Sequence, residues 1–293
     1  MPKKRNQQEQ TKHYFDKSAK SWQNKSNNLN IKIPVIQQRN SYVLEHVKTS
    51  KKKIKNFLDI GCGTGELVFE ISKKNINSLG VDFSEKMISQ CKKYSNKFSN
   101  FLCSDVLNLS LSKKYDLMSA NGFIEYISLN QLNKFLKNSP QILSKNAVII
   151  FSVRNRLFNV LSLNQFTRPE LKSALASKLL HECLFFIEKN NLDELANLPA
   201  INFQKTNFTH SNTGIGVASR FQYTPSQIYR ILKKNNFKLL EIAGINTHLF
   251  PRNINSNNKQ KNEIYFNINQ PYKFGSIDNI PFSSTFMVKA KLC

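Results

Sequence analysis

The chain has 293 residues, of which 40% are hydrophobic and 21% are charged, with nine Gly and nine Pro. This composition is that of an ordinary globular protein, and it excludes wholesale disorder, a collagen-like chain and a disulfide scaffold. Five cysteines without a CxxC pair favour reduced thiols and a cytoplasmic location. The apolar runs are too short to span a membrane, and no apolar stretch follows the basic N-terminus, so we expect neither a membrane span nor a secretory signal.

The net charge of +24 is large, and a field of this size attracts polyanions, RNA above all. The basic residues are, however, 35 Lys and only eight Arg. Arg is the residue whose bidentate fork suits phosphates and bases. A solvated lysine-rich surface, of the kind that codon bias produces in a chain also rich in Asn and Ile, explains the charge more simply. Nucleic acid is therefore the less favoured partner.

The predicted elements begin with helical patterns in the first 55 residues. Tyr14, Phe15, Ala19 and Trp22 recur at helical spacing, and we expect cap helices over 1–55. Strands then alternate with helices. The strands are expected at 57–60, 78–82, 100–104, 115–120 and 147–153, and the helices at 66–74, 84–94 and 129–143. This alternation predicts an α/β fold, a doubly wound and mainly parallel sheet covered on both faces.

The alternation stops after Arg154. Residues 155–223 contain a long amphipathic helix, expected at 170–188, and we interpret this range as a helical substrate lid inserted after strand five. The alternation resumes with a helix at 224–234 and strands at 238–243 and 284–292, with a surface loop at 251–282. The sheet then has seven strands. The expected cofactor-binding domain comprises 56–154 and 224–293.

A glycine-rich loop joins the first strand of this sheet to the helix that follows. It reads LDIGCGTG, at the place where open α/β sheets bind ligands. Glycines there let a nucleoside approach the backbone. Glu66 occupies the position of a third dinucleotide glycine at the helix N-terminus, which disfavours a pyrophosphate. Asp82 ends strand two, 21 residues after Gly61, where an acid accepts from both hydroxyls of a ribose.

Three segments, LDIGCGTG, GVDFSEKMI and CSDVLNL, resemble the nucleotide-binding signature of class I S-adenosylmethionine-dependent methyltransferases. The resemblance is strong over 40–154 and extends by pattern to 224–293. It implies the Rossmann-like methyltransferase fold and S-adenosyl-L-methionine as cofactor. Glu125-Tyr126 and the segment from Tyr14 to Trp22 are similar to the small-molecule branch of the family, the ubiquinone-biosynthesis-type O-methyltransferases.

The resemblance also implies roles for individual residues. Asp82 would accept from the ribose hydroxyls, Asp105 from the adenine amino group, and Arg39 would reach the cofactor carboxylate. The full set of implied cofactor-binding residues is Arg39, Asp59, Gly61, Gly63, Gly65, Asp82, Phe83, Met87, Asp105, Val106, Asn121 and Phe123.

Methyl transfer from a sulfonium requires an aligned nucleophile and a dry site more than it requires a base. The sequence does not identify a catalytic base, and the candidates are Tyr14, Tyr126, His181 and His210. Relatives in the small-molecule branch have His where this chain has Tyr126, and some have an acid where it has Gly122. A metal held by those groups would lack ligands, so we expect none.

Four of the eight arginines fall in or beside the insertion, which suggests an anionic group on the substrate: Arg154, Arg156, Arg168 and Arg220. The segment after strand four does not have the Asn-Pro-Pro-Tyr pattern of base-methylating enzymes. The sequence therefore predicts methyl transfer to an oxygen or nitrogen of a small metabolite. An RNA or protein methyltransferase that uses the basic surface stays open, as does a non-catalytic cofactor-binding homologue.

Overall fold

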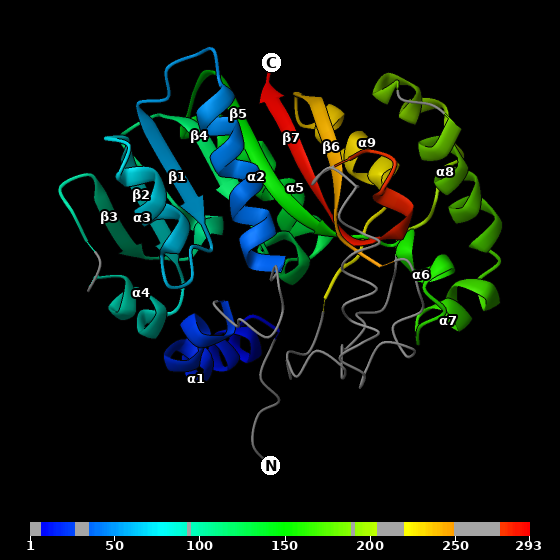
Figure 1. The fold of residues 1–293 in the computed structure, drawn as a ribbon, viewed down its shortest axis with the longest axis horizontal. Coiled ribbons are helices and arrows are strands. Elements are labelled where there is room, and N and C mark those ends of the chain that lie inside the picture. Colours follow the sequence, from blue (N-terminus) through cyan, green and yellow to red (C-terminus); the bar gives the residue numbers. More distant parts are fainter. Residues whose placement is uncertain (1–6, 27–34, 93–94, 189–190, 204–219, 249–275) are drawn as a thin grey trace, which may run out of the picture.

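A computed structural model describes residues 7–26, 35–92, 95–188, 191–203, 220–248 and 276–293. Its centre is a seven-stranded sheet in the order β3-β2-β1-β4-β5-β7-β6 (Figure 1). The strands are β1 (Asn56–Ile60), β2 (Asn77–Asp82), β3 (Ser99–Cys103), β4 (Tyr115–Ala120), β5 (Leu143–Arg154), β6 (Phe237–Thr247) and β7 (Ser283–Leu292). The first five run parallel, and β7 is antiparallel to both of its neighbours. The expected doubly wound, mainly parallel sheet is confirmed.

Helices cover both faces of this sheet. They are α1 (Gln7–Ser26), α2 (Val35–Thr49), α3 (Glu66–Ser72), α4 (Glu85–Cys91), α5 (Leu129–Asn138), α6 (Phe158–Leu161), α7 (Thr167–Lys172), α8 (Ala176–Glu188) and α9 (Pro225–Lys234). Successive residues of β1 point to opposite faces, as the strand period requires. Phe57 packs in the core under α2, α3 and α4, and Leu58 packs in the core under α5 and α9.

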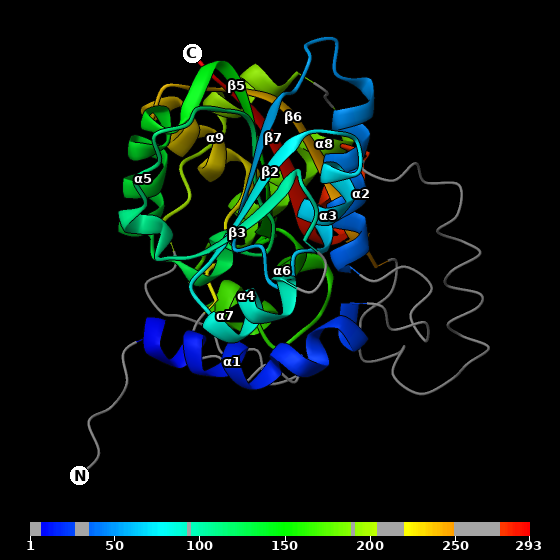
Figure 2. The same cartoon turned by 90° about the vertical axis from the view of Figure 1, so that its left-hand side faces the viewer.

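The topology places one edge of the sheet where a ligand can bind. Strands β1 and β4 are neighbours in the sheet although β2 and β3 lie between them in sequence. The chain therefore leaves β1 and β4 toward opposite faces, and the loops at their carboxyl ends diverge and leave a crevice. Helix α1 lies across this edge (Figures 1 and 2).

The prediction of one continuous helix over 170–188 is wrong, because the structure has two helices there, α7 and α8. Glu170 in α7 is buried against Arg156, while α8 packs Leu179 and Cys183 into the core. The two helices need different directions to make both contacts, and Ala174 between them has φ 56°. The helix expected over 129–143 also ends earlier, at Asn138, because Pro140 lies in the 3-10 turn Ser139–Gln141 that follows.

The role of residues 155–223 as a substrate lid stays a prediction. Helix α8 lies at the β6 end of the sheet (Figure 1), and its Glu182 accepts from the N–H of Ser226, in the first turn of α9, at 2.7 Å. Residues 204–219, with His210, lie outside the described residues, as does most of the loop expected at 251–282. Among the described helices, none is long and apolar enough to cross a membrane.

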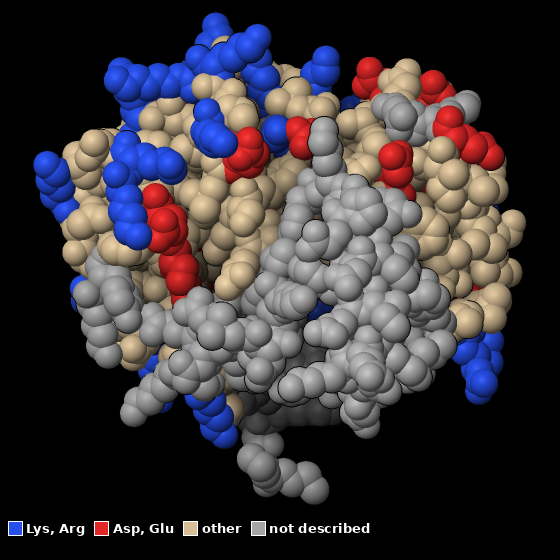
Figure 3. Space-filling model, in the orientation of Figure 1, with Lys and Arg blue, Asp and Glu red and all other residues tan. Residues whose placement is uncertain are grey.

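Lysines gather at the edge opposite to α1. Figure 3 shows Lys and Arg concentrated over the end of the molecule where β1 begins. Exposed residues there include Lys51, Lys52, Lys53 and Lys55, which precede β1. On this face, the densest positive charge therefore lies at the end of the sheet away from the carboxyl ends of the parallel strands.

Candidate active site

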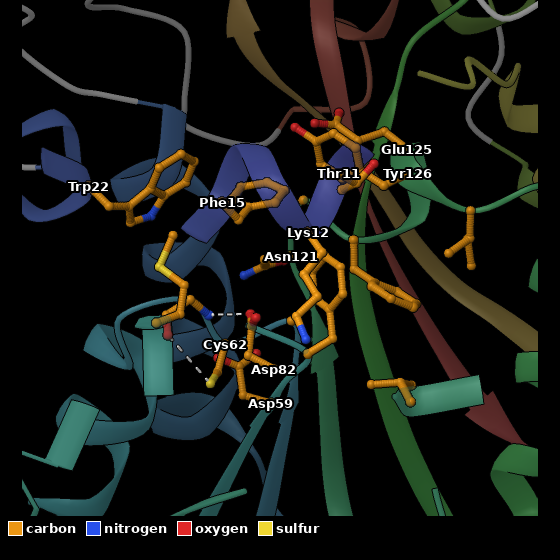
Figure 4. A pocket seen from close by; sticks show the side chains of 18 of the residues that line it. Thr11, Lys12, Phe15, Trp22, Asp59, Cys62, Asp82, Asn121, Glu125 and Tyr126 are labelled. Atoms are coloured by element: carbon orange, nitrogen blue, oxygen red, sulfur yellow. Dashed lines mark hydrogen bonds between the residues drawn. The ribbon is translucent and has the colours of Figure 1, made fainter. Parts of the chain in front are cut away.

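A cavity of about 580 Å³ lies at the carboxyl ends of β1, β2 and β4, with α1 across its mouth. It is lined by residues of the glycine loop, by the ends of the strands and by α1 and α2 (Figure 4). The structure brings together all of the residues implied for the cofactor except Gly65. A volume of this size is typical of sites for small molecules.

The glycine loop is held down by backbone hydrogen bonds to β2. The N–H groups of Gly61 and Cys62 donate to the carbonyl of Val81 at 2.8 and 3.1 Å. Gly65 has φ 83° and begins α3. A Cβ at Gly65 would lie 2.7 Å from the Phe101 ring, so this glycine allows the helix to start against β3 rather than lining the cavity.

Asp82 is the buried acid at the end of β2, 6% exposed. Its carboxylate accepts from the N–H of Gly63 at 3.0 Å and from the N–H of Ser84 at 2.9 Å. Burial raises the pKa of Asp82 to about 6, although both of these hydrogen bonds lower it. The carboxylate is thus fixed between the glycine loop and the start of α4, and Asp82 lines the cavity there.

Asp59 lies deeper, on β1, and its carboxylate accepts from the hydroxyl of Ser119 at 2.5 Å. Burial raises the pKa of Asp59 to about 7, because the Ser119 hydrogen bond offsets only part of the desolvation and the charge of Asp82 adds to it. Two buried acids therefore face the same cavity. A cationic or hydrogen-donating ligand would be needed to hold both of them ionised at neutral pH.

Helix α1 supplies an aromatic wall. The ring of Phe15 packs edge-to-face on Trp22 and Tyr126, with centroids 5.4 Å apart in each case, and on Phe83 at 6.4 Å. Figure 4 shows Phe15 and Trp22 on the side of the cavity opposite to Asp59 and Asp82. The wall thus extends from the cofactor side, at Phe83, to the far end of the cavity, at Tyr126.

Three arginines surround one glutamate at that far end, and we call Arg39, Glu125, Arg154 and Arg220 the arginine cluster. Glu125 follows β4 and is 4% exposed. Its Oε2 accepts from Arg154 Nε at 2.8 Å and lies 3.8 Å from Arg39 Nη2. Burial alone would raise the pKa of Glu125, but the three guanidiniums lower it to about 2.

Arg220 completes the arginine cluster from a distant part of the sequence. The N–H of Phe221 donates to the carbonyl of Glu125 at 2.8 Å, which holds this segment beside the turn after β4. Arg220 Nη2 donates to the hydroxyl of Tyr126 at 2.9 Å. Its Nε and Nη1 are buried, and within the described part of the chain they have no hydrogen-bond partner; the same holds for Arg39 Nε.

The four candidate bases lie in different parts of the molecule, and only one of them is shown to line the cavity. Tyr126 lines the cavity, and burial raises the pKa of its phenol. Tyr14 packs on Phe15 without lining the cavity, and His181 is exposed on α8. His210 lies outside the described residues. Asp105 lines the cavity, and its side chain also accepts from the N–H of Leu107 at 3.0 Å.

Sequence reasoning missed Glu125 as the centre of the arginine cluster, and it assigned Arg156 to the same anion-binding group as Arg220. Arg156 instead makes a buried, two-bond ion pair with Glu170, at 2.9 and 2.8 Å. No sequence signal separates these arginines, because the contacts come from segments distant along the chain. The described residues hold no group of three His, Cys, Asp or Glu side chains arranged to bind a metal ion.

Comparison with known proteins agrees with this geometry. Residues 58–149 match a family model described as a methyltransferase domain. Over these residues the chain resembles the methyltransferase domain of the class I S-adenosylmethionine-dependent enzymes. This domain holds the glycine loop, Asp82, Asp105 and the turn after β4, which are the parts of the cavity that the family's cofactor, S-adenosylmethionine, would occupy.

Relatives of the methyltransferase domain extend the likeness to most of the chain. The ubiquinone biosynthesis O-methyltransferase of Rickettsia bellii is 22% identical over 79% of this chain and 82% of its own length. The enzyme of the same name from Rickettsia prowazekii is 26% identical, and the match spans 48% of this chain and 58% of that protein. The magnesium protoporphyrin IX methyltransferase of Synechocystis, solved with bound SAH, is 13% identical with a TM-score of 0.56, covering 98% of this chain and all of that one. That structure supports the fold.

Proposed function

We propose that this chain transfers a methyl group from S-adenosylmethionine to an oxygen or nitrogen of a small-molecule acceptor. The observation that carries this proposal is the continuity of the cavity. The same cavity is lined by Asp82 and the glycine loop at one end and by Tyr126 and Arg220 at the other. Cofactor and acceptor therefore fit side by side, as a direct transfer requires.

In this proposal the side chains around the cavity bind and orient the cofactor and the acceptor, and they take little part in the chemical step itself. S-adenosylmethionine, when bound, supplies both the methyl group and its leaving group. Asp82 would accept from the ribose hydroxyls, and Asp59, which is buried in the same cavity, would favour a cationic group. Phe15 and Trp22 line the cavity on the α1 side, where their rings would exclude water from the reacting groups. Such alignment lowers the activation free energy of a displacement by roughly 7–11 kcal/mol.

The acceptor in this proposal is small and carries an anionic group. The arginine cluster lies at the end of the cavity away from Asp82, and its guanidiniums outnumber its carboxylates three to one. Buried guanidinium groups require anionic or hydrogen-bonding partners. A cytoplasmic location belongs to the same proposal, and it is supported by five free cysteines.

Two measurements test this function. S-adenosylhomocysteine at saturating concentration should raise the unfolding midpoint of the protein, because the ligand binds only the folded state. Incubation with S-adenosylmethionine and a deproteinised metabolite extract should then release S-adenosylhomocysteine and give a product heavier by one CH₂. Unchanged thermal stability would contradict the assignment of the cofactor, and binding without turnover would favour a non-catalytic homologue.

A further inference from the structure

The arginine cluster holds more positive charge than its own groups balance. Arg39, Arg154 and Arg220 face the single carboxylate of Glu125, which leaves an excess of two positive charges at one end of the cavity. Arg220 is 1% exposed and Arg39 is 8% exposed, so water offers them little compensation. Buried charges without partners are costly, and binding sites are where such groups persist.

The unpartnered atoms show where the missing anions belong. Nε and Nη1 of Arg220 and Nε of Arg39 are buried and have no hydrogen-bond partner among the described residues, and both arginines line the cavity. Arg154 is already engaged, because its Nε donates to Glu125 at 2.8 Å. Two guanidiniums thus have unengaged donors, and the cluster has an excess of two positive charges. Both numbers are those expected for a site that binds two anionic groups.

The cofactor can supply only one of these anions, its amino-acid carboxylate. Arg39 is on α2, and its Nη1 would lie 2.7 Å from a Cβ at Gly122, in the turn after β4. In Arg220, Nη2 donates to Tyr126 and the guanidinium carbon lies 5.3 Å from the centre of the Tyr126 ring. If Arg39 takes the cofactor carboxylate, Arg220 is left for an anion of the acceptor.

The arginine cluster and the neighbouring Tyr126 also offer no group suited to remove a proton from the acceptor. The described lining of the cavity includes no histidine. The Glu125 carboxylate is stabilised by its arginines, and its pKa of about 2 makes it a weak base. The hydroxyl of Tyr126 accepts from Arg220, and burial raises the pKa of this phenol, which keeps it protonated. An acceptor that is already ionised needs no such base.

From these observations we infer that the acceptor is a small organic carboxylate, which Arg220 binds and whose oxygen receives the methyl group. This inference rests on the proposed methyltransferase function and narrows its acceptor to one chemical class. A carboxylate oxygen forms the bond to the methyl carbon while the sulfur–methyl bond breaks and its electron pair stays on sulfur. The products are a methyl ester and neutral S-adenosylhomocysteine. No proton moves in this step.

The chemistry of the product tests this inference directly. The full chain is incubated with S-adenosylmethionine carrying a tritiated methyl group and a deproteinised bacterial metabolite extract, and the products are treated with mild alkali. A methyl ester releases its label as volatile methanol, whereas methyl ethers and methylamines keep it. We expect most of the transferred label to become volatile. An alkali-stable product would overturn the carboxylate acceptor while leaving the methyltransferase function intact.

A binding experiment tests the role of Arg220 without turnover. Benzoate and hexanoate are compared with benzamide and hexanamide as ligands of the protein saturated with S-adenosylhomocysteine, by their effect on the unfolding midpoint. The carboxylates should bind the wild type more tightly than the amides, and Arg220→Gln should weaken carboxylate binding by about 10- to 100-fold. Equal binding of acids and amides, or an unchanged preference in Arg220→Gln, would overturn the inference.

Matched variants separate binding from folding. Arg220→Lys keeps the positive charge but loses the paired N–H donors of the planar guanidinium. Its affinity for carboxylates should therefore lie between those of the wild type and Arg220→Gln. Arg168 is exposed on α7 and does not line the cavity, so Arg168→Gln should retain full affinity. Arg39→Gln should weaken S-adenosylhomocysteine more than the acids. If the wild type itself does not bind S-adenosylhomocysteine, that result would instead contradict the proposed function.

Discussion

The hydroxyl of Ser84 donates a hydrogen bond of 2.5 Å to the carboxylate of Asp16, which joins α1 to the start of α4. The same hydroxyl oxygen accepts from the N–H of Met87 and caps α4. Ser84 also donates its backbone N–H to Asp82, the acid expected to bind the ribose. The helix across the cavity is therefore tied to the residues that would hold the nucleoside.

We predict that loss of this tie speeds cofactor exchange. Asp16→Ala removes the acceptor, so α1 should open more often, and the dissociation rate of S-adenosylhomocysteine should rise about 5-fold, for a loss of roughly 1 kcal/mol. Stopped-flow displacement measures this rate. Asp16→Asn keeps an acceptor oxygen at the same position and serves as the control. Equal dissociation rates in Asp16→Ala and the wild type would contradict the role of this contact.

Trp22 should report on ligand binding, because it is the single tryptophan of the chain. Its indole nitrogen lies 3.6 Å from a Cβ built on Gly63, at the cofactor end of the cavity. A nucleoside beside the indole should change the intensity or the maximum of its emission, and titration with S-adenosylhomocysteine measures this. Trp22→Phe removes the signal. If thermal stabilisation shows binding while the emission stays constant at saturation, the indole does not face the ligand.

Most of the fold was predictable because local patterns and topology agree. Each buried parallel strand is a short apolar run, and the helices that follow begin at recognisable caps such as Ser84 and Thr224. The two errors in helix bounds arose where tertiary contacts determine direction, at the bend around Ala174 and at Pro140. The cofactor side of the cavity follows one continuous segment, so its residues could be found along the sequence.

The acceptor side was not predictable in the same way. Glu125 and Arg220 come from the turn after β4 and from the segment before α9, and no spacing relates them. Composition alone indicated arginines near the insertion, but it grouped Arg220 with Arg156. Only the fold shows that Arg156 is paired with Glu170, while Arg220 keeps donors at the cavity that no described residue accepts from.

Gly122 is predicted to be required for the position of Arg39. It has φ 70°, and a Cβ there would lie 2.7 Å from Arg39 Nη1. Gly122→Ala should cost about 1–2 kcal/mol of stability for the left-handed backbone and displace the guanidinium, so that cofactor affinity falls about 10-fold. Isothermal titration checks the affinity. In an Arg39→Gln background the same substitution should cause little further loss, and full additivity would show that the two residues act separately.

The two buried acids predict how stability depends on pH without ligand. Burial raises the pKa of Asp59 to about 7 and that of Asp82 to about 6, from 3.8. The folded state then binds more protons than the unfolded state between these values, so the free energy of unfolding should fall as pH rises from 5 to 8. Asp59→Asn should reduce this slope and stabilise the free protein at pH 8 by on the order of 2–4 kcal/mol, while weakening cofactor binding. Urea unfolding at several pH values measures the slope, and a slope unchanged by Asp59→Asn would show that this carboxyl titrates normally.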